Sequence, residues 1–215
     1  MPLLDEKTRE EVAAELADLE KPVKLMMFTQ DFECQFCKET RELCEEVAEL
    51  SEKISVEIYD FVADKDKADE YGVDKIPAIV VVGAKDYGVR FFGIPSGYEF
   101  MSVLDGIKTV AAGQVELMPE TLAFLEELEE PLHLQVFITP TCPYCPRAVI
   151  LAHHLAIASD KVTADMVEAI EFPHLAQKYS VMGVPRSVIN ETVHQEGAAP
   201  EPMLLERLKE AVSAE

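Results

Sequence analysis

Short apolar segments alternate with amphipathic, charged segments along the whole chain. Segments dominated by apolar and β-branched residues predict buried strands, and segments with apolar residues on one face among charges predict helices. The predicted strands are residues 23–29, 54–61, 77–83, 89–93, 132–139, the middle of 162–172, and 186–193. The predicted helices are residues 5–19, 37–50, 65–73, 99–113, 119–130, 147–159, 174–181 and 201–212.

The order of these elements occurs twice, and residues repeat at a fixed spacing. Cys34 and Cys142 are 108 positions apart, and Pro77 and Pro185 are also 108 positions apart. A tyrosine and a valine between them repeat at the same spacing. Helices alternating with strands, followed by a strand pair, predict an α/β fold, and the repeat predicts two copies of it.

The length of the chain agrees with two copies. Its 215 residues are enough for two domains of about 100 residues each. We expect the boundary within the segment GQVELMP, which gives units of residues 1–117 and 118–215. Each unit is expected to hold a mixed central sheet flanked by helices.

The charge of the chain narrows its partners. There are 41 acidic and 19 basic residues and a formal net charge of −22, so nucleic-acid binding is not expected. No apolar run reaches the roughly 18 residues that would span a membrane. The first 20 residues are charged and amphipathic, unlike a signal peptide. We therefore expect a cytoplasmic protein that binds neither nucleic acid nor membrane.

Four of the five cysteines form two C-x-x-C pairs, Cys34–Cys37 and Cys142–Cys145. In a reducing compartment such pairs are typical of catalysis or metal binding. Each pair lies between a predicted strand and a predicted helix, where backbone N–H groups and the helix dipole stabilise a thiolate. We predict Cys34 and Cys142 as exposed nucleophiles, and Cys37 and Cys145 as the thiols that resolve the mixed disulfide. Cys44 lies on the same predicted helix face as Cys37 and is expected to be a core thiol.

A proline follows the first cysteine of each pair by 43 residues and begins a predicted strand. If this peptide bond is cis, the backbone of Ile76 or Val184 would lie beside the dithiol, where a substrate segment could pair as an added strand. An ordinary strand-start proline is the alternative, but two at one spacing favour a role in the site. We therefore predict Ile76, Pro77, Val184 and Pro185 as substrate-binding residues. Arg186, which follows the second proline, could contact substrate, lower the pKa of the nearby thiol, or be a plain surface residue.

These residues resemble a known family. A C-x-x-C pair between a strand and a helix, with a proline 43 residues later, resembles the thioredoxin fold, and CPYC at 142–145 is the glutaredoxin-type active-site sequence. Two such units, with CQFC first and CPYC second, resemble the protein disulfide oxidoreductases of archaea and thermophilic bacteria. The resemblance covers nearly the whole chain and implies two tandem thioredoxin-like folds.

The resemblance also implies a function. Both dithiols would exchange disulfides with protein substrates, as a reductase and further as an oxidase or isomerase. A thioredoxin-reductase-like flavoprotein would supply electrons, and neither a metal ion nor another cofactor would be bound. Of the two pairs, we expect Cys142–Cys145 to be the more active.

The chain departs from the family in its buried acid. Many thioredoxins carry an aspartate six residues before the first cysteine, where it assists proton transfer, but here those positions are Phe28 and Val136. Glu57, Asp60 or Glu168, on the neighbouring strands, could substitute for it. The favoured alternative is that these three are partly solvated charges at strand ends.

Two other functions use the same cysteines. Four thiolates could form a structural zinc site, but the pairs of a zinc site are normally separated by about 15–20 residues, and here more than 100 residues intervene. An electron-relay module, which passes reducing equivalents from a flavoprotein to a peroxidase, would use the same thiol chemistry. In such modules one half usually lacks its dithiol, and both dithiols are present here.

Overall fold

The computed structural model describes residues 3–213. Its helices are α1 (Glu6–Leu16), α2 (Cys37–Ala48), α3 (Lys65–Glu70), the 3-10 turn η1 (Gly97–Glu99), α4 (Phe100–Ala112), α5 (Pro119–Glu127), α6 (Cys145–Ala158), α7 (Pro173–Lys178) and α8 (Glu201–Ser213). Its strands are β1 (Val23–Thr29), β2 (Ile54–Asp60), β3 (Ala78–Val82), β4 (Asp86–Phe92), β5 (Leu132–Ile138), β6 (Val162–Glu168), β7 (Arg186–Ile189) and β8 (Val193–Glu196).

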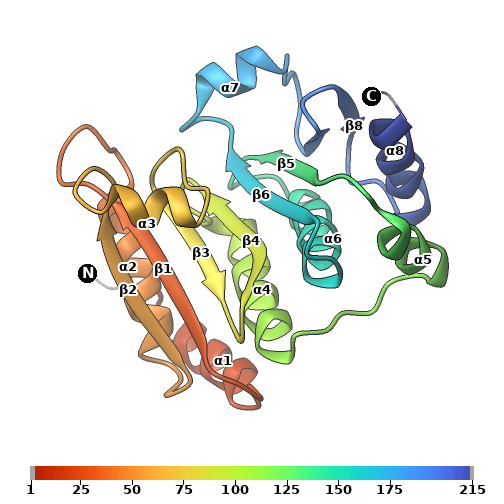
Figure 1. The fold of residues 1–215 in the computed structure, drawn as a ribbon. Coiled ribbons are helices and arrows are strands. Elements are labelled where there is room, and N and C mark those ends of the chain that lie inside the picture. Colours follow the sequence, from red (N-terminus) through yellow and green to blue (C-terminus); the bar gives the residue numbers. More distant parts are fainter. Residues whose placement is uncertain (1–2, 214–215) are drawn as a thin grey trace.

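These strands form one continuous sheet, ordered β2-β1-β3-β4-β6-β5-β7-β8. Each half of the chain supplies four of them, with its first two strands parallel and its last two antiparallel. The predicted mixed sheet in each half is therefore confirmed. The halves meet where β4 pairs in parallel with β6 and Arg90 lies opposite Asp165 (Figure 1). This junction was not predicted, because pairing between two strand edges leaves no local pattern in the sequence.

The strand directions bring both cysteine pairs to one end of the sheet. Strands β1, β2, β4, β5 and β6 all run in the same direction, because each is parallel to a neighbour or separated from one by the single antiparallel strand β3. The chain leaves β1 and β5 at this end to reach the cysteines, and β3 and β7 begin there. We call it the cysteine end of the sheet.

The two faces of the sheet carry separate hydrophobic cores. Strand residues alternate between them, as period-2 side chains must: Met27 and Val136 pack on one face, and Phe28 and Phe137 on the other. The larger core lies under α1, α2, α4, α6 and α8, and Figure 1 shows α2, α4 and α6 behind the sheet. The smaller core lies under α3 and the segment around α7.

Close packing across the junction fixes the two halves together. Gly88 has φ +80°, and a Cβ there would lie 2.7 Å from the carbonyl oxygen of Val162, so only glycine fits. His153 of α6 is 1% exposed, its Nε2 lies 3.1 Å from the carbonyl oxygen of Arg90, and its ring meets that of Phe91 edge-on at 4.8 Å. The halves are therefore joined through the core as well as through the sheet.

One predicted strand was wrong. Residues 186–193 were expected to form a single strand, but the structure has a hairpin of β7 and β8. Asn190 and Glu191 take φ of +43° and +63°, which suits a tight turn between antiparallel strands. Asparagine tolerates this conformation, whereas a glutamate there gave no turn signal in the sequence.

Within residues 3–213, none of the helices has the length and apolar character needed to cross a membrane.

The buried His153 predicts how stability depends on pH. Burial lowers its pKa to about 4, although the hydrogen bond to the Arg90 carbonyl acts in the opposite direction. The unfolded chain therefore takes up a proton below about pH 6.5 that the folded chain refuses. Stability from this group is complete above pH 6.5, and we expect about 3 kcal/mol of it to be lost as the pH falls to 4.

Urea unfolding of the oxidised protein at a series of pH values measures this loss. Other groups also titrate in this range, so the His153→Phe variant serves as the reference. The difference in free energy of unfolding between the two proteins should change steeply between pH 6.5 and 4. Parallel curves for the two proteins would show that His153 does not contribute.

Candidate active site

The first cysteine pair lies between β1 and α2. Cys34 and Cys37 form a disulfide with their Cα atoms 5.5 Å apart. Cys37 is the first residue of α2 and is 2% exposed, whereas Cys34 precedes the helix and is half-buried. The helix start was expected at the first cysteine and lies at the second. The more accessible sulfur is nevertheless that of the first cysteine.

The second pair repeats this geometry between β5 and α6. Cys142 and Cys145 form a disulfide, again with Cα atoms 5.5 Å apart. Cys145 begins α6 and is fully buried, and Cys142 is 8% exposed, so the predicted exposed nucleophile is in fact largely covered. The covering segment, described below, comes from the other half of the chain.

The two prolines lie at the cysteine end of the sheet, as the strand register requires. Pro77 immediately precedes β3, whose first residue Ala78 lies opposite Phe28 near the end of β1. Pro185 immediately precedes β7, whose first residue Arg186 lies opposite Phe137 near the end of β5. The register thus places each proline beside the strand that leads into its cysteine pair.

The backbone around each proline also repeats. The Ile76–Pro77 and Val184–Pro185 peptide bonds are both cis. The carbonyl oxygen of each proline accepts a hydrogen bond at 2.9 Å from a glycine N–H, Gly93 in the first half and Gly197 in the second. In the second half a surface groove of about 320 Å³ runs beside this segment, lined by Met182, Gly183, Val184, Pro185, Glu196 and Gly197.

A buried glutamate from the first half faces the second centre, and the sequence analysis missed it. Glu99, in η1, is fully buried; the Ser102 hydroxyl donates to its Oε2 at 2.8 Å, and its Oε1 has no partner. Burial raises its pKa to about 7, although the bond from Ser102 acts to lower it. The turn η1 packs against α6, and the Tyr98 N–H donates to the Pro140 carbonyl at 3.1 Å. No sequence signal linked Glu99 to a cysteine pair in the other half.

Two more buried carboxyl groups lie at the same junction. Glu168 ends β6 opposite Ile138, is 2% exposed, and its Oε1 has no partner; burial raises its pKa. Glu171 accepts a hydrogen bond from the Ile94 N–H at 2.6 Å. Burial and the neighbouring Glu168 raise its pKa to about 7, against the effect of that hydrogen bond. The junction therefore holds carboxyl groups that can carry protons near neutral pH.

The three acids considered from sequence have different environments. Glu57 pairs with Lys24 at 2.6 Å and accepts from the Tyr59 hydroxyl at 2.5 Å, and these two bonds lower its pKa. Asp60 is exposed and accepts hydrogen bonds from two backbone N–H groups of the following loop. Both are solvated strand-end charges, as the favoured alternative held. Glu168 is the exception, because it is buried.

Arg186 and Cys44 are both committed to structural contacts. Arg186 pairs with Glu196 at 2.5 Å and contacts the His194 ring at 2.9 Å, so its side chain bridges β7 and β8. Cys44 is 2% exposed, and burial raises its pKa to about 12. A thiol with such a pKa stays protonated at neutral pH and is a poor nucleophile, which agrees with the expected core role.

The positions of the two pairs do not fit a shared zinc ion. Strands β1 and β5 are separated by three other strands, and four strand spacings correspond to about 19 Å. A zinc tetrathiolate needs all four sulfurs at about 2.3 Å from one ion. Among residues 3–213 there is also no group of three or more His, Cys, Asp or Glu side chains arranged for a metal ion.

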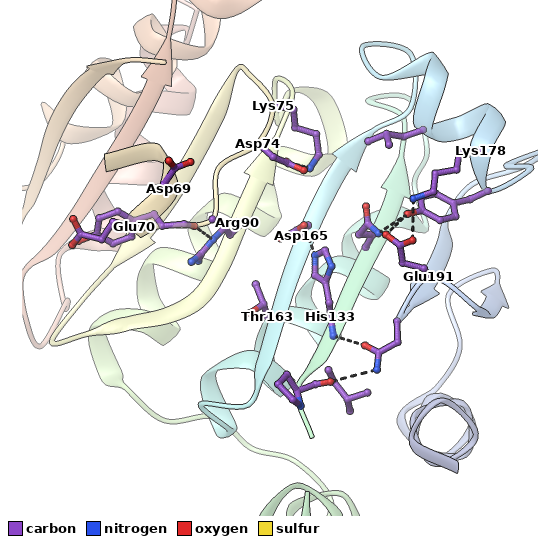
Figure 2. Close-up of a pocket in the computed structure, with 18 residues that line it drawn as sticks. Asp69, Glu70, Asp74, Lys75, Arg90, His133, Thr163, Asp165, Lys178 and Glu191 are labelled. Atoms are coloured by element: carbon purple, nitrogen blue, oxygen red, sulfur yellow. Dashed lines mark hydrogen bonds and ion pairs between the residues drawn. The ribbon is translucent and has the colours of Figure 1, made fainter. Parts of the chain in front are cut away.

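A polar cleft of about 550 Å³ lies on the sheet face that carries α3 and α7, and no cysteine lines it (Figure 2). Its charged groups pair with one another: His133 Nε2 lies 2.6 Å from Asp165, and Lys178 lies 3.0 Å from Glu191. Burial lowers the pKa of His133, but the hydrogen bond and charge of Asp165 outweigh it, and the pKa is raised. The cleft is therefore a set of closed ion pairs between the halves, apart from the redox centres.

The fold and the two disulfides define a thiol–disulfide oxidoreductase with two thioredoxin-like units. Comparison with known proteins agrees. The family model described as "Thioredoxin domain" matches residues 23–105 and 132–210. The chain belongs to the thioredoxin domain family.

Solved structures of similar proteins match along the whole chain. A protein disulfide oxidoreductase from Aeropyrum pernix is 31% identical, with a TM-score of 0.91 over 99% of this chain and 96% of that one. The NTD_N/C domain of the alkylhydroperoxide reductase AhpF from Enterococcus faecalis is 27% identical, with a TM-score of 0.87 over 95% of this chain and 99% of that one.

Curated relatives are longer proteins. The alkyl hydroperoxide reductase protein AhpF of Staphylococcus aureus is 24% identical over 184 residues, which are 81% of this chain and 34% of that protein. A protein of Bacillus subtilis named NADH dehydrogenase is 24% identical over 153 residues, 71% of this chain and 28% of that protein. The chain thus spans about a third of the length of these relatives.

The contact between the halves at the second centre predicts the effect of one substitution. Gly97 has φ +60°, and a Cβ there would lie 2.4 Å from the carbonyl oxygen of Pro140, two residues before Cys142. We expect Gly97→Ala to lower the free energy of unfolding by about 2–4 kcal/mol through backbone strain and this clash. It should also slow disulfide exchange at Cys142 and leave exchange at Cys34 unchanged.

Gly72→Ala is the matched control. Gly72 has φ +64°, but nothing lies within 4 Å of a Cβ placed there. It reports the strain of a left-handed alanine alone, about 1 kcal/mol. Equal losses in chemical unfolding for the two variants would show that the contact with Pro140 is unimportant.

Proposed function

We propose that the chain reduces, oxidises and isomerises disulfides of protein substrates through both of its centres. The observation that carries this proposal is the repeated arrangement at the cysteine end of the sheet. In each half a bonded cysteine pair opens a helix, and the register places a cis-proline segment beside the strand that precedes it. In keeping with the 108-residue repeat, we place the boundary between the units at residues 117 and 118.

The roles within each pair follow from accessibility. In the reductive direction the thiolate of Cys34 or Cys142 attacks one sulfur of the substrate disulfide, and the other substrate sulfur leaves as a thiolate. Cys37 or Cys145 then loses its proton and attacks the mixed disulfide, which releases the second substrate sulfur. The substrate gains two electrons and two protons, and the cysteine pair becomes a disulfide. The reverse sequence oxidises a substrate dithiol.

The proline segments are proposed to hold the substrate. Ile76 and Val184 precede the strands β3 and β7, so their backbone groups lie outside the sheet ladder at the cysteine end. An extended substrate segment can pair with them as an added strand, which aligns its disulfide without requiring a particular sequence. Pro77 and Pro185 fix the course of the backbone at these points.

Glu99 is proposed to accept the proton of Cys145. The resolving thiol is fully buried, so water cannot take its proton directly. A carboxyl group with a pKa of about 7 is suited to accept a proton and return it at neutral pH. Glu168, buried at the end of β6, is proposed as the next carrier toward solvent.

A flavoprotein of the thioredoxin-reductase type is proposed as the electron donor, and the cytoplasm as the site of action. A second function, relay from a flavoprotein to a peroxidase, is favoured by the similarity to the NTD_N/C domain of AhpF. Both functions use the same exchange steps and differ in the acceptor.

Disulfide reduction by variants that keep one centre tests the proposal. Cys34→Ser/Cys37→Ser leaves only the second centre, and Cys142→Ser/Cys145→Ser leaves only the first. With dithiothreitol as the electron source, each variant should retain insulin disulfide reduction, and the variant lacking all four cysteines should retain none above background. Full activity in the four-serine variant would refute the assignment.

Trapping experiments separate the two roles within a pair. Cys145→Ser should accumulate a mixed disulfide through Cys142, because the resolving thiol is gone, while Cys142→Ser should accumulate none.

The role of Glu99 predicts a change in pH profile. In the variant that keeps only the second centre, the exchange rate should rise as the pH increases through about 7, where Glu99 becomes a base. Glu99→Gln should remove this rise and lower the rate above pH 7 by about tenfold or more.

The same substitution in the variant that keeps only the first centre is the control, and its profile should not change. An unaltered profile at the second centre would rule out Glu99 as its proton acceptor.

A further inference from the structure

The two centres differ in the charge of the loop that leads into them. The loop before the first centre carries Asp31 and Glu33, both exposed, and Glu33 is the residue adjacent to Cys34. At the same positions, 108 residues later, the second centre has Thr139 and Thr141. Two carboxylates at the first centre are thus replaced by two neutral hydroxyls.

Neighbouring segments change in the same direction. Asp60 ends β2 opposite Thr29 and is exposed, whereas its counterpart Glu168 is buried at the end of β6. Glu39, in the first turn of α2, corresponds to Arg147 in the first turn of α6, which is exposed. The accessible surface around the first centre is therefore acidic, and that around the second is neutral with one added cation.

The apolar part of the surface is common to both centres. Val62 and Ile170, at corresponding positions after β2 and β6, are 70% and 71% exposed. Phe32 at the first centre, and Tyr144 and Met182 at the second, are also exposed. Exposed apolar side chains of this kind contact unfolded or extended substrates at either centre. Charge, and not hydrophobicity, distinguishes the two.

We propose that the two centres select different protein disulfides by charge: Cys34–Cys37 exchanges with disulfides flanked by lysine and arginine, and Cys142–Cys145 with disulfides in neutral or acidic surroundings. Asp31, Glu33 and Asp60 are the residues that determine the selectivity of the first centre, and Arg147 that of the second. This inference rests on the proposed function. The exchange step is the one given above, with two electrons passing from the dithiol to the substrate.

The physical basis is screened Coulomb attraction. Asp31 and Glu33 lie within three residues of the reactive sulfur, a chain distance of at most about 11 Å, comparable with the Debye length of about 10 Å at 0.1 M salt. A substrate disulfide bonded to Cys34 therefore brings its flanking residues into the field of these carboxylates. The attraction acts on encounter and alignment, so it appears in the second-order rate constant and weakens with salt.

The test uses three disulfide-bonded peptides with the same ring, flanked by lysine, by glutamate or by serine. Each is reacted with the chemically reduced one-centre variants, Cys142→Ser/Cys145→Ser and Cys34→Ser/Cys37→Ser. At low salt the first centre should react at least about tenfold faster with the lysine than with the glutamate peptide, and in about 1 M salt less than about twofold faster. The second centre should give a lysine-to-glutamate ratio of about one or below at low salt.

Exchanging the loop residues is the matched control. Asp31→Thr/Glu33→Thr in the first centre should bring its ratio down toward that of the second, and Thr139→Asp/Thr141→Glu should raise the ratio of the second. Equal ratios at the two centres, a preference that persists in high salt, or ratios that do not follow the exchanged residues would overturn the charge selectivity alone. Failure of both variants to react with the serine peptide would instead overturn the proposed function, and this inference with it.

Discussion

The parallel pairing of β4 with β6 is the constraint on which the rest of the structure depends. It merges two four-stranded sheets into one and gives them a common direction, so both cysteine pairs and both prolines arrive at the same end. It also brings η1 of the first half against α6 of the second. Without this pairing the two halves would be separate redox modules on a tether, and the second disulfide would lose the cover that Tyr98 and Pro140 provide.

Most of the fold could be predicted from the sequence because its information is local. The apolar alternation of β1 and β5, the charged faces of α2 and α8, and the 108-residue repeat all act within one segment or between identical copies. The junction could not be predicted, because strand β4 has the same alternation whether its outer edge meets water or β6. The hairpin after Arg186 was missed for a related reason, since a glutamate at positive φ is imposed by the strands around it.

The site divides in the same way. The cysteines and prolines were predicted because their spacing is fixed by one unit's own fold. Glu99 was not predicted, because its relation to Cys145 exists only after the two halves pack. Burial also decided among the candidate acids: Asp60 and Glu168 occupy equivalent strand ends, yet only the second is covered, by the first half of the chain. Sequence spacing cannot distinguish a covered strand end from an open one.

The origin of Glu99 bears on how the duplicated chain evolved. Val136 occupies the position where an independent unit would keep its own buried acid. Once a neighbouring copy supplied a carboxyl group from outside, that internal position was free to drift to a hydrophobic residue. The second half thereby became dependent on its twin, and gene fission would now yield a dithiol stripped of its base. Tandem fusion here is an irreversible step of inheritance rather than a doubling of capacity.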